Sequence, residues 1–137
     1  MKSVFIGGVP TAGKSHLANK LAKITGATHV NLDDLRSEML KDSSLEPWVN
    51  FFWNQDESEY WKKVITSDEH WENLKKQSEA FWPTILAKIS EENKTGEKTI
   101  FEGVNILPHL VHKDLPFRGV FLLSPSEDDV LNRLKTL

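Results

Sequence analysis

The sequence predicts an α/β fold with a parallel sheet, and three observations support that prediction. A short apolar, β-branched run over 3–7 leads into glycines, which is typical of a buried strand that enters a tight turn. Apolar residues at helical spacing follow over 14–24, and Gly26 predicts the end of that helix. Two more short apolar runs, 98–101 and 119–123, are flanked by breakers and do not alternate. Strands separated by helices imply parallel pairing, with helices on both faces of the sheet.

The remaining elements are read in chain order from the same patterns. The run 28–32 predicts a strand, and 35–40 predicts a helix after it. Apolar residues recur at mostly helical spacing over 68–90, where Pro83 is expected to kink or break the helix. The segment Ser124-Pro125-Ser126-Glu127 has the N-cap, first-turn proline and acidic residue that begin a helix.

Length, composition and charge exclude several classes of protein. A chain of 137 residues has room for one ordinary core, so we expect a single domain over 1–137. The absence of cysteine excludes disulfides and thiolate chemistry, and the formal net charge of -3 gives no overall attraction to a long nucleic acid. No apolar run is long enough to span a membrane or to form the core of a signal peptide. We therefore expect a cytoplasmic protein without membrane or long nucleic-acid partners.

The segment 8–15 (GVPTAGKS) matches the phosphate-binding pattern GxxxxGK[ST] at every fixed position, and it lies between a predicted strand and a predicted helix. Such a loop turns backbone N–H groups onto phosphate oxygens, and the following helix points its positive end at the same anion. We expect Lys14 to bridge the β- and γ-phosphates of ATP and Ser15 to be a ligand of Mg²⁺. The alternative is a glycine-rich turn that contains these residues by chance. The expected nucleotide contacts are Gly8, Thr11, Ala12, Gly13, Lys14, Ser15 and His16.

Acidic residues follow two of the predicted strands, at the sheet edge where parallel α/β proteins bind ligands. Asp33 is the candidate to accept the proton of an acceptor hydroxyl, and Arg36, one helical turn on, could bind substrate or phosphate oxygens. Asp34 is then expected to cap the following helix, although either aspartate could have either role. For Glu102 three roles stay open: helping to hold Mg²⁺, binding the acceptor, or facing solvent as an ordinary strand-end acid.

These segments resemble the P-loop kinases of small molecules and of nucleic-acid ends. Residues 30–36 (VNLDDLR) look like the strand-two segment of the polynucleotide 5′-hydroxyl kinases and related small-molecule kinases. In those families the first Asp is the catalytic base and the Arg aids phosphate binding, roles that fall here on Asp33 and Arg36. Residues 100–108 (IFEGVNILP) are similar to a segment of 2-phosphoglycerate kinase-like proteins. The same features resemble ATP-binding proteins of the AAA family that are similar to zeta-toxin and chloramphenicol phosphotransferase.

The resemblance implies a three-layer P-loop NTPase fold of the nucleoside monophosphate kinase-like type, with strand order 2-3-1-4. It also implies a helical insert over 41–90 that forms the acceptor side, and an arginine-bearing lid and fifth strand beyond the fourth. The sequence offers Arg133 as its one lid-like arginine and ends at Leu137, so we expect the lid and fifth strand to be missing from this chain. The aromatic residues of the insert could stack on a base, line an apolar acceptor pocket or form the insert's own core. The residues meant are the aromatic cluster over 48–61: Trp48, Phe51, Phe52, Trp53, Tyr60 and Trp61.

Taken together, the residues predict an ATP-dependent, Mg²⁺-dependent kinase that moves the γ-phosphate to a hydroxyl of a small molecule or nucleic-acid end. The alternative from another class is a nucleotide-dependent switch or regulatory NTPase that binds a protein partner. Asp33 with Arg36 favours the kinase, because a switch does not need them. The sequence does not predict the acceptor, the choice between ATP and GTP, or the oligomeric state. Four histidines are not assigned to the site: His29, His70, His109 and His112.

Overall fold

The structure is a computed structural model that describes residues 3–9, 12–52 and 67–123. Its elements are β1 (Ser3–Gly8), α1 (Lys14–Thr25), β2 (Thr28–Asn31), the 3-10 helix η1 (Leu32–Leu35), α2 (Arg36–Met39), α3 (Glu46–Val49), α5 (Ser67–Asn93), β3 (Thr99–Glu102), α6 (Pro108–Asp114) and β4 (Gly119–Leu122). Several predicted features lie outside the described residues: Thr11, Trp53, Tyr60, Trp61, the helix expected from Ser124, and Arg133.

The four strands form a parallel sheet in the order β2-β3-β1-β4, which confirms the predicted strand order. The pairing register aligns Glu102 with both Ile6 of β1 and Asn31 of β2. On the other side of β1, Gly8 aligns with Leu122. The carboxyl ends of β1, β2 and β3 therefore lie side by side, so the chain segments that follow these strands begin at one edge of the sheet.

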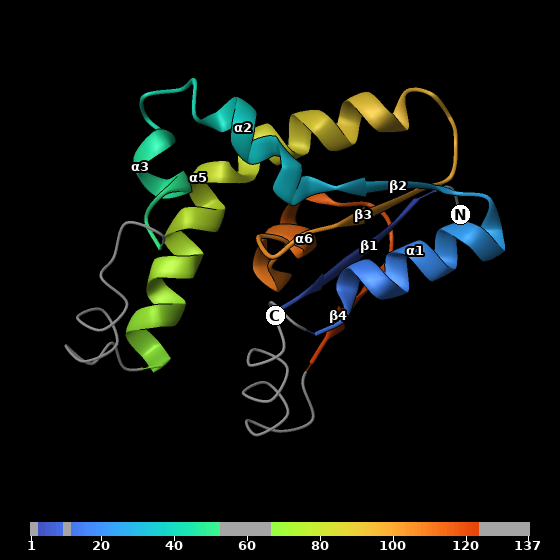
Figure 1. Cartoon of the computed structure of the whole chain (residues 1–137), viewed down its shortest axis with the longest axis horizontal. Helices are drawn as coiled ribbons and strands as arrows, with labels where there is room; N and C mark the ends of the chain where they lie inside the picture. Colours follow the sequence, from blue (N-terminus) through green and yellow to red (C-terminus); the bar gives the residue numbers. More distant parts are fainter. Residues whose placement is uncertain (1–2, 10–11, 53–66, 124–137) are drawn as a thin grey trace.

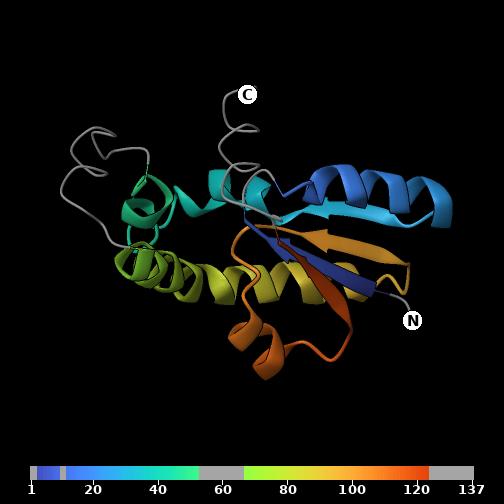
Figure 2. The same cartoon turned by 90° about the horizontal axis from the view of Figure 1, so that it is seen from below.

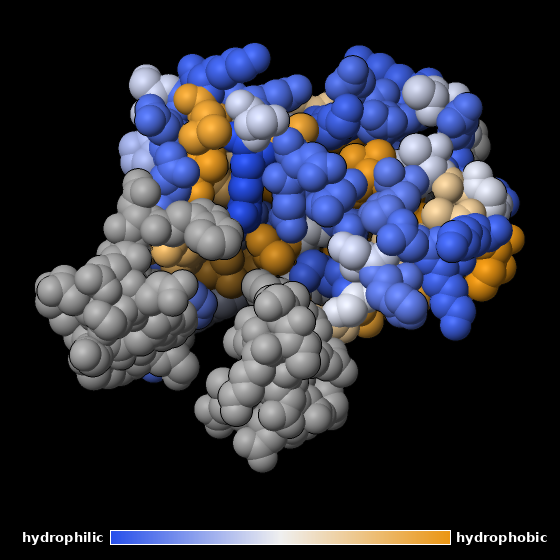
Figure 3. Space-filling view, viewed as in Figure 1, coloured by the Kyte–Doolittle hydropathy of each residue, from blue (hydrophilic) through white to orange (hydrophobic). Residues whose placement is uncertain are grey.

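The sheet is the middle of three layers, with α1 over one face and α5 and α6 over the other (Figures 1 and 2). Side chains alternate between the faces along each strand, as a β-strand requires. Phe5 and Phe101 accordingly pack with α5 and α6, whereas Ile6 and Ile100 pack against Ala18 of α1. Hydrophilic residues cover most of the described surface on the face shown in Figure 3.

Two glycines in the left-handed region bound α1, Gly13 with φ 94° at its beginning and Gly26 with φ 71° at its end. The end at Gly26 agrees with the prediction. The helix predicted over 35–40 begins earlier, because η1 starts directly after β2. The side chain of Asn31 caps η1 by accepting a hydrogen bond from the Asp33 N–H at 3.0 Å. The prediction that Asp34 is the cap is wrong, since Asp34 is exposed and α2 has no side-chain cap.

Helix α5 runs without interruption through Pro83, so the proline does not break it. The helix changes direction along its length, as Figure 1 shows, and proline is the common cause of such a bend because it removes one backbone hydrogen bond. The residues around the proline are deeply buried and hold the helix against the sheet: Phe81, Trp82, Ile85 and Ile89. Within the described part of the chain, no helix is both long and apolar enough to cross a membrane.

Replacing the fully buried Phe101 with alanine tests the core on the α5 face of the sheet. We expect Phe101→Ala to lower the free energy of unfolding by about 3–5 kcal/mol, because it removes buried apolar surface and leaves a cavity. Ile24→Ala is the matched control, since Ile24 is 73% exposed, and it should change the same quantity by less than about 0.5 kcal/mol. Urea unfolding measures both. Similar losses in the two variants would contradict this account of the core.

Candidate functional site

The loop between β1 and α1 begins where β1 meets β4. A Cβ atom at Gly8 would lie 2.5 Å from the carbonyl oxygen of Leu122, and the φ of Gly8 is 139°, so only glycine fits there. At the other end of the loop, α1 starts after Gly13 with no acidic residue in its first turn and no side-chain cap. The cap residue Gly13 therefore offers no side-chain acceptor to the first N–H groups of α1, and the positive end of the helix faces the loop.

Lys14 is the first residue of α1, directly after this loop, and is only 8% exposed. Its ammonium group donates a hydrogen bond to the carbonyl oxygen of Val9 at 2.9 Å. Burial lowers the pKa of Lys14, and the negative charges of Asp33 and Glu102 partly oppose that shift. The ammonium group of Lys14 is therefore bonded to the preceding loop and lies near the carboxylates of Asp33 and Glu102.

Glu102, at the end of β3, is hydrogen-bonded through one oxygen to side chains of α1 and β2. Its Oε1 accepts a hydrogen bond from the Ser15 hydroxyl at 2.8 Å and lies 2.9 Å from Nε2 of His29. Of the three roles left open for Glu102, the one of a strand-end acid facing solvent is excluded, because the residue is 1% exposed: β3 lies between two other strands, and α1 covers this face. Its other oxygen, Oε2, is buried and has no hydrogen-bond partner. A buried carboxylate oxygen without a partner is costly, so this atom is available to a cation.

Asp33 lies near the same group of charges. Its Oδ1 accepts a hydrogen bond from the N–H of Val104 at 3.3 Å. Burial raises the pKa of Asp33, and the opposing effects of Arg36, the Val104 N–H and Lys14 do not cancel that shift. Asp34, by contrast, is exposed. The structure thus separates the two neighbouring aspartates into one partly buried carboxylate and one at the surface.

Arg36 is fixed from two sides. One of its terminal nitrogens donates to Oδ1 of Asn105 at 3.1 Å, and its guanidinium carbon lies 6.0 Å from the centre of the Phe81 ring. Its Nε is buried and has no hydrogen-bond partner. The positive charge of Arg36 acts on Asp33, whose pKa it lowers. Asp33 and Arg36 therefore lie close enough for their charges to interact.

Asn105 connects Arg36 to the helical insert through buried side chains. Its amide nitrogen donates to Oε1 of Gln77 at 3.0 Å and to the hydroxyl of Ser78 at 2.8 Å. The amide nitrogen of Gln77 in turn donates to the backbone oxygen of Trp48 at 2.8 Å. Sequence reasoning missed this network, although Gln77 and Ser78 stand within the predicted apolar helix, where a polar residue needs a partner.

The remaining predicted nucleotide contacts lie in the loop and in the first turn of α1. Ala12 is half-buried, and its N–H donates to the Val9 oxygen at 3.2 Å, while Gly13 and His16 are exposed. His29 is a further site residue that the sequence interpretation left out. The signal that could have found it is strand alternation, because a residue two positions before the end of β2 shares a face with that end.

The described aromatic residues of the insert contact one another. Ring centres of Trp48 and Phe51 lie 5.1 Å apart, and those of Phe51 and Phe52 lie 5.0 Å apart. Phe52 also lies 5.4 Å from the ring of His70 in α5, and Trp48 packs against the main core. These rings form a local core, which is one of the three roles that the sequence left open.

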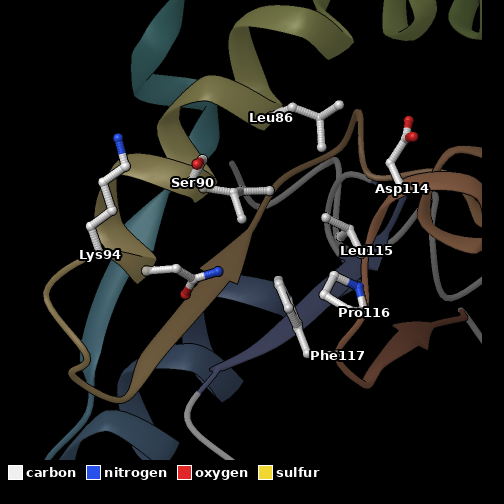
Figure 4. Close-up of a pocket in the computed structure, with 9 residues that line it drawn as sticks. Leu86, Ser90, Lys94, Asp114, Leu115, Pro116 and Phe117 are labelled. Atoms are coloured by element: carbon white, nitrogen blue, oxygen red, sulfur yellow. The ribbon is translucent and has the colours of Figure 1, made fainter.

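A cavity of about 380 Å³ lies elsewhere, between the last turns of α5 and the segment that joins α6 to β4 (Figure 4). Two of its polar side chains already have partners. Asn93 accepts a hydrogen bond from Ser3 at the start of β1, and Asp114 accepts one from the Trp82 indole. Because Ser3 begins β1, this cavity lies toward the amino ends of the strands, and we assign no function to it.

Asp33→Asn tests the burial of the Asp33 carboxylate. Its pKa is raised above 3.8, so the protonated form contributes stability that is fully present below about pH 3.8 and is lost as the pH rises through the raised pKa. The asparagine side chain at position 33 has no ionisable proton, so the free energy of unfolding of the variant does not include this loss. We therefore expect the free energy of unfolding of Asp33→Asn, minus that of the parent chain, to become more positive between about pH 3 and pH 7.

Urea unfolding over that pH range measures this difference. Asp34→Asn is the matched control, because Asp34 is exposed, and its difference from the parent should stay nearly flat. A difference for Asp33→Asn that falls with rising pH would show that attraction by Arg36 and Lys14 outweighs burial.

Comparison with known proteins adds information about the fold. No family model matches the chain, and no curated protein matches its sequence. Among solved structures, it is similar to an unliganded sugar kinase from Janibacter sp. HTCC2649, with a TM-score of 0.52 and 14% sequence identity. The match covers 100% of this chain and 68% of that one. At this identity the likeness shows the fold alone, and the chain thus has a kinase-like α/β fold built on a parallel sheet in the order β2-β3-β1-β4.

Proposed function

We propose that the chain binds ATP with Mg²⁺ at the loop between β1 and α1 and transfers the γ-phosphate to a hydroxyl group of a small molecule. The observation that supports this most strongly is the hydrogen bond between Ser15 and Glu102, beside the buried Lys14. A phosphate-binding lysine, a hydroxyl and a strand-end carboxylate meet there, although Ser15 and Glu102 are 87 positions apart in the sequence. This combination is the one that P-loop proteins use for a nucleotide and its metal ion.

The residues at this edge fit a magnesium ion. Mg²⁺ prefers oxygen ligands and takes few from the protein, because it keeps waters and phosphate oxygens in its shell. Ser15 and Glu102 offer a hydroxyl and a carboxylate, and Oε2 of Glu102 is buried without a partner. Among the described residues, no group of three or more histidine, cysteine or acidic side chains could hold a metal. When bound, Mg²⁺ would neutralise charge on the transferring phosphoryl group.

Lys14 is the residue that we assign to the phosphates. In the structure its ammonium donates to the Val9 oxygen, and phosphate oxygens can replace that carbonyl as a stronger acceptor. The uncapped first turn of α1 supports the same anion site, since its N–H groups and positive dipole face the loop.

Asp33 is the residue that we assign to the acceptor. Its Oδ1 already accepts the Val104 N–H, so Oδ2 would receive the hydroxyl proton while the hydroxyl oxygen bonds to the γ-phosphorus. The bond from that phosphorus to the bridging oxygen breaks at the same time, and ADP leaves with its electron pair. Burial raises the pKa of Asp33, which makes it a better proton acceptor than an exposed aspartate. Arg36 would bind oxygens of the acceptor or of the phosphates.

The choice of a small acceptor has two supports. The structural neighbour is a sugar kinase by its description, and the net charge of -3 gives this chain no general attraction to a long polyanion. A nucleic-acid end is the alternative acceptor. The acceptor is found by offering sugars, nucleosides and oligonucleotides with a free 5′-hydroxyl, together with ATP and Mg²⁺, and detecting by mass spectrometry which compound gains a phosphate. Phosphate release to water alone, with every acceptor unchanged, would favour the nucleotide-dependent switch.

Lys14→Ala tests the nucleotide site. We expect its affinity for ATP with Mg²⁺ to fall by about 10- to 100-fold or more, because the variant loses a charge-assisted contact to the phosphates. Calorimetric titration measures the affinity. Lys20→Ala is the matched control, since Lys20 is an exposed lysine on the same helix, and it should bind ATP like the parent. Unchanged binding by Lys14→Ala would refute the assignment of the loop.

Asp33→Asn tests the proton acceptor. We expect phosphoryl transfer to the acceptor found by the screen to slow by about 10²- to 10⁴-fold, because the amide cannot take the proton. The affinity for ATP should stay nearly unchanged. Asp34→Asn is the control one position along, and it should transfer phosphate at the parent rate because Asp34 is exposed. Single-turnover transfer measures both variants, and equal losses would reject Asp33 as the base.

A further inference from the structure

His29 contacts the proposed metal site from the edge strand of the sheet. It belongs to β2, where it is aligned with Ile100, two residues before Glu102. Ile100 packs on the α1 side of the sheet, and Glu102 faces the same side because side chains alternate along a strand. His29 and Glu102 are thus diagonal neighbours on two adjacent strands, within reach of each other.

Both ring nitrogens of His29 have partners. Nε2 lies 2.9 Å from Oε1 of Glu102, and Nδ1 lies 3.0 Å from the side-chain oxygen of Asn19 in α1. If Asn19 presents its oxygen, both ring nitrogens carry protons and the ring is charged. If the Asn19 amide is turned, its NH₂ group donates to Nδ1, and the neutral ring carries its one proton on Nε2. In both arrangements His29 donates a hydrogen bond to the Glu102 carboxylate.

Two donors therefore converge on one oxygen of Glu102. Ser15 and His29 both bond to Oε1, whereas Oε2 stays buried without a partner. The two donors can act together in the proposed site. A hydroxyl has one proton and two lone pairs, so Ser15 would hold Mg²⁺ through a lone pair and still donate its proton to Glu102. Among the described residues, His29 is the donor to that carboxylate that is not itself a proposed ligand of the ion.

We infer that His29 is a positioning residue, which holds Oε1 of Glu102 so that Oε2 is presented to the metal ion of the bound nucleotide. Asn19 supports the ring from the other side. This inference rests on the proposed function and adds to it a residue outside the phosphate-binding loop. A carboxylate that ligates a metal is commonly oriented by a second hydrogen bond, and loss of such a partner typically lowers metal affinity by 10- to 100-fold.

The test compares two amides at position 29. The amide nitrogen of glutamine falls near the position of the histidine Nε2, so His29→Gln keeps a donor for Glu102. The shorter asparagine places its amide near the position of Nδ1, facing Asn19, so His29→Asn removes that donor. ATP is titrated into each protein in EDTA and then at increasing Mg²⁺, and calorimetry gives the Mg²⁺ concentration at which half of the gain in ATP affinity is reached.

For His29→Asn we expect that Mg²⁺ concentration to rise by about 10- to 100-fold, with the ATP affinity in EDTA unchanged. His29→Gln should recover most of the loss. His109→Asn is the matched control, because the His109 Nε2 also pairs with a glutamate, Glu79, at 3.2 Å, but on the exposed surface. That control should respond to Mg²⁺ like the parent.

The other outcomes separate the inference from the function on which it rests. Parent-like Mg²⁺ dependence in His29→Asn, or an equal loss in both position-29 variants, would overturn the positioning role while the nucleotide site stands. A parent chain that binds ATP no better with Mg²⁺ than in EDTA would overturn the proposed metal site, and the role of His29 with it. Thermal unfolding of each variant accompanies the titrations, because a purely structural histidine would change the melting temperature without changing the Mg²⁺ dependence.

Discussion

The parallel register around β3 places most of the proposed site. Glu102 ends β3 at the level of Ile6 in β1 and of Asn31 in β2, so the segments after these strands start together. The loop with the phosphate-binding sequence pattern follows β1, and Asp33 follows β2. A shift of the β2 pairing by one residue would turn His29 away from Glu102 and toward the α5 face, because the side-chain period of a strand is two. The register of the strands therefore also fixes the geometry of the proposed site.

Charge at this edge is costly to the fold and useful to the proposed chemistry. Burial lowers the pKa of Lys14 and raises that of Asp33, so each group pays a desolvation penalty that its charged neighbours only partly offset. One oxygen of Glu102 and one nitrogen of Arg36 are buried with no partner. Unsatisfied groups of both signs at one sheet edge are expected where a charged ligand completes the site. These buried charges and unpaired atoms lower the free energy of unfolding and leave groups that a ligand can bind.

A buried polar network connects the helical insert to this edge of the sheet. Trp48 in α3 bonds to Gln77 of α5, Gln77 bonds to Asn105 after β3, and Asn105 holds Arg36. Such networks fix geometry when their members are satisfied, because an alternative arrangement would strand a buried polar group. The same hydrogen-bond network therefore holds both the insert and Arg36. A movement of α3 against α5 would change the position of the Arg36 side chain.

The sequence by itself determined what depends on near neighbours in the chain: the position of the loop between β1 and α1, the four strands, and the end of α1 at Gly26. It also selected Glu102 and Asp33, since acids after buried strands lie at the ligand edge. The tertiary structure decided the partners. Ser15 and Glu102 are 87 positions apart, and His29 and Glu102 are 73 apart. The helix cap is Asn31 and not the predicted Asp34, because η1 begins directly after β2. The spacing of residues along the chain does not predict such contacts, because they form only when the strands pair into the sheet.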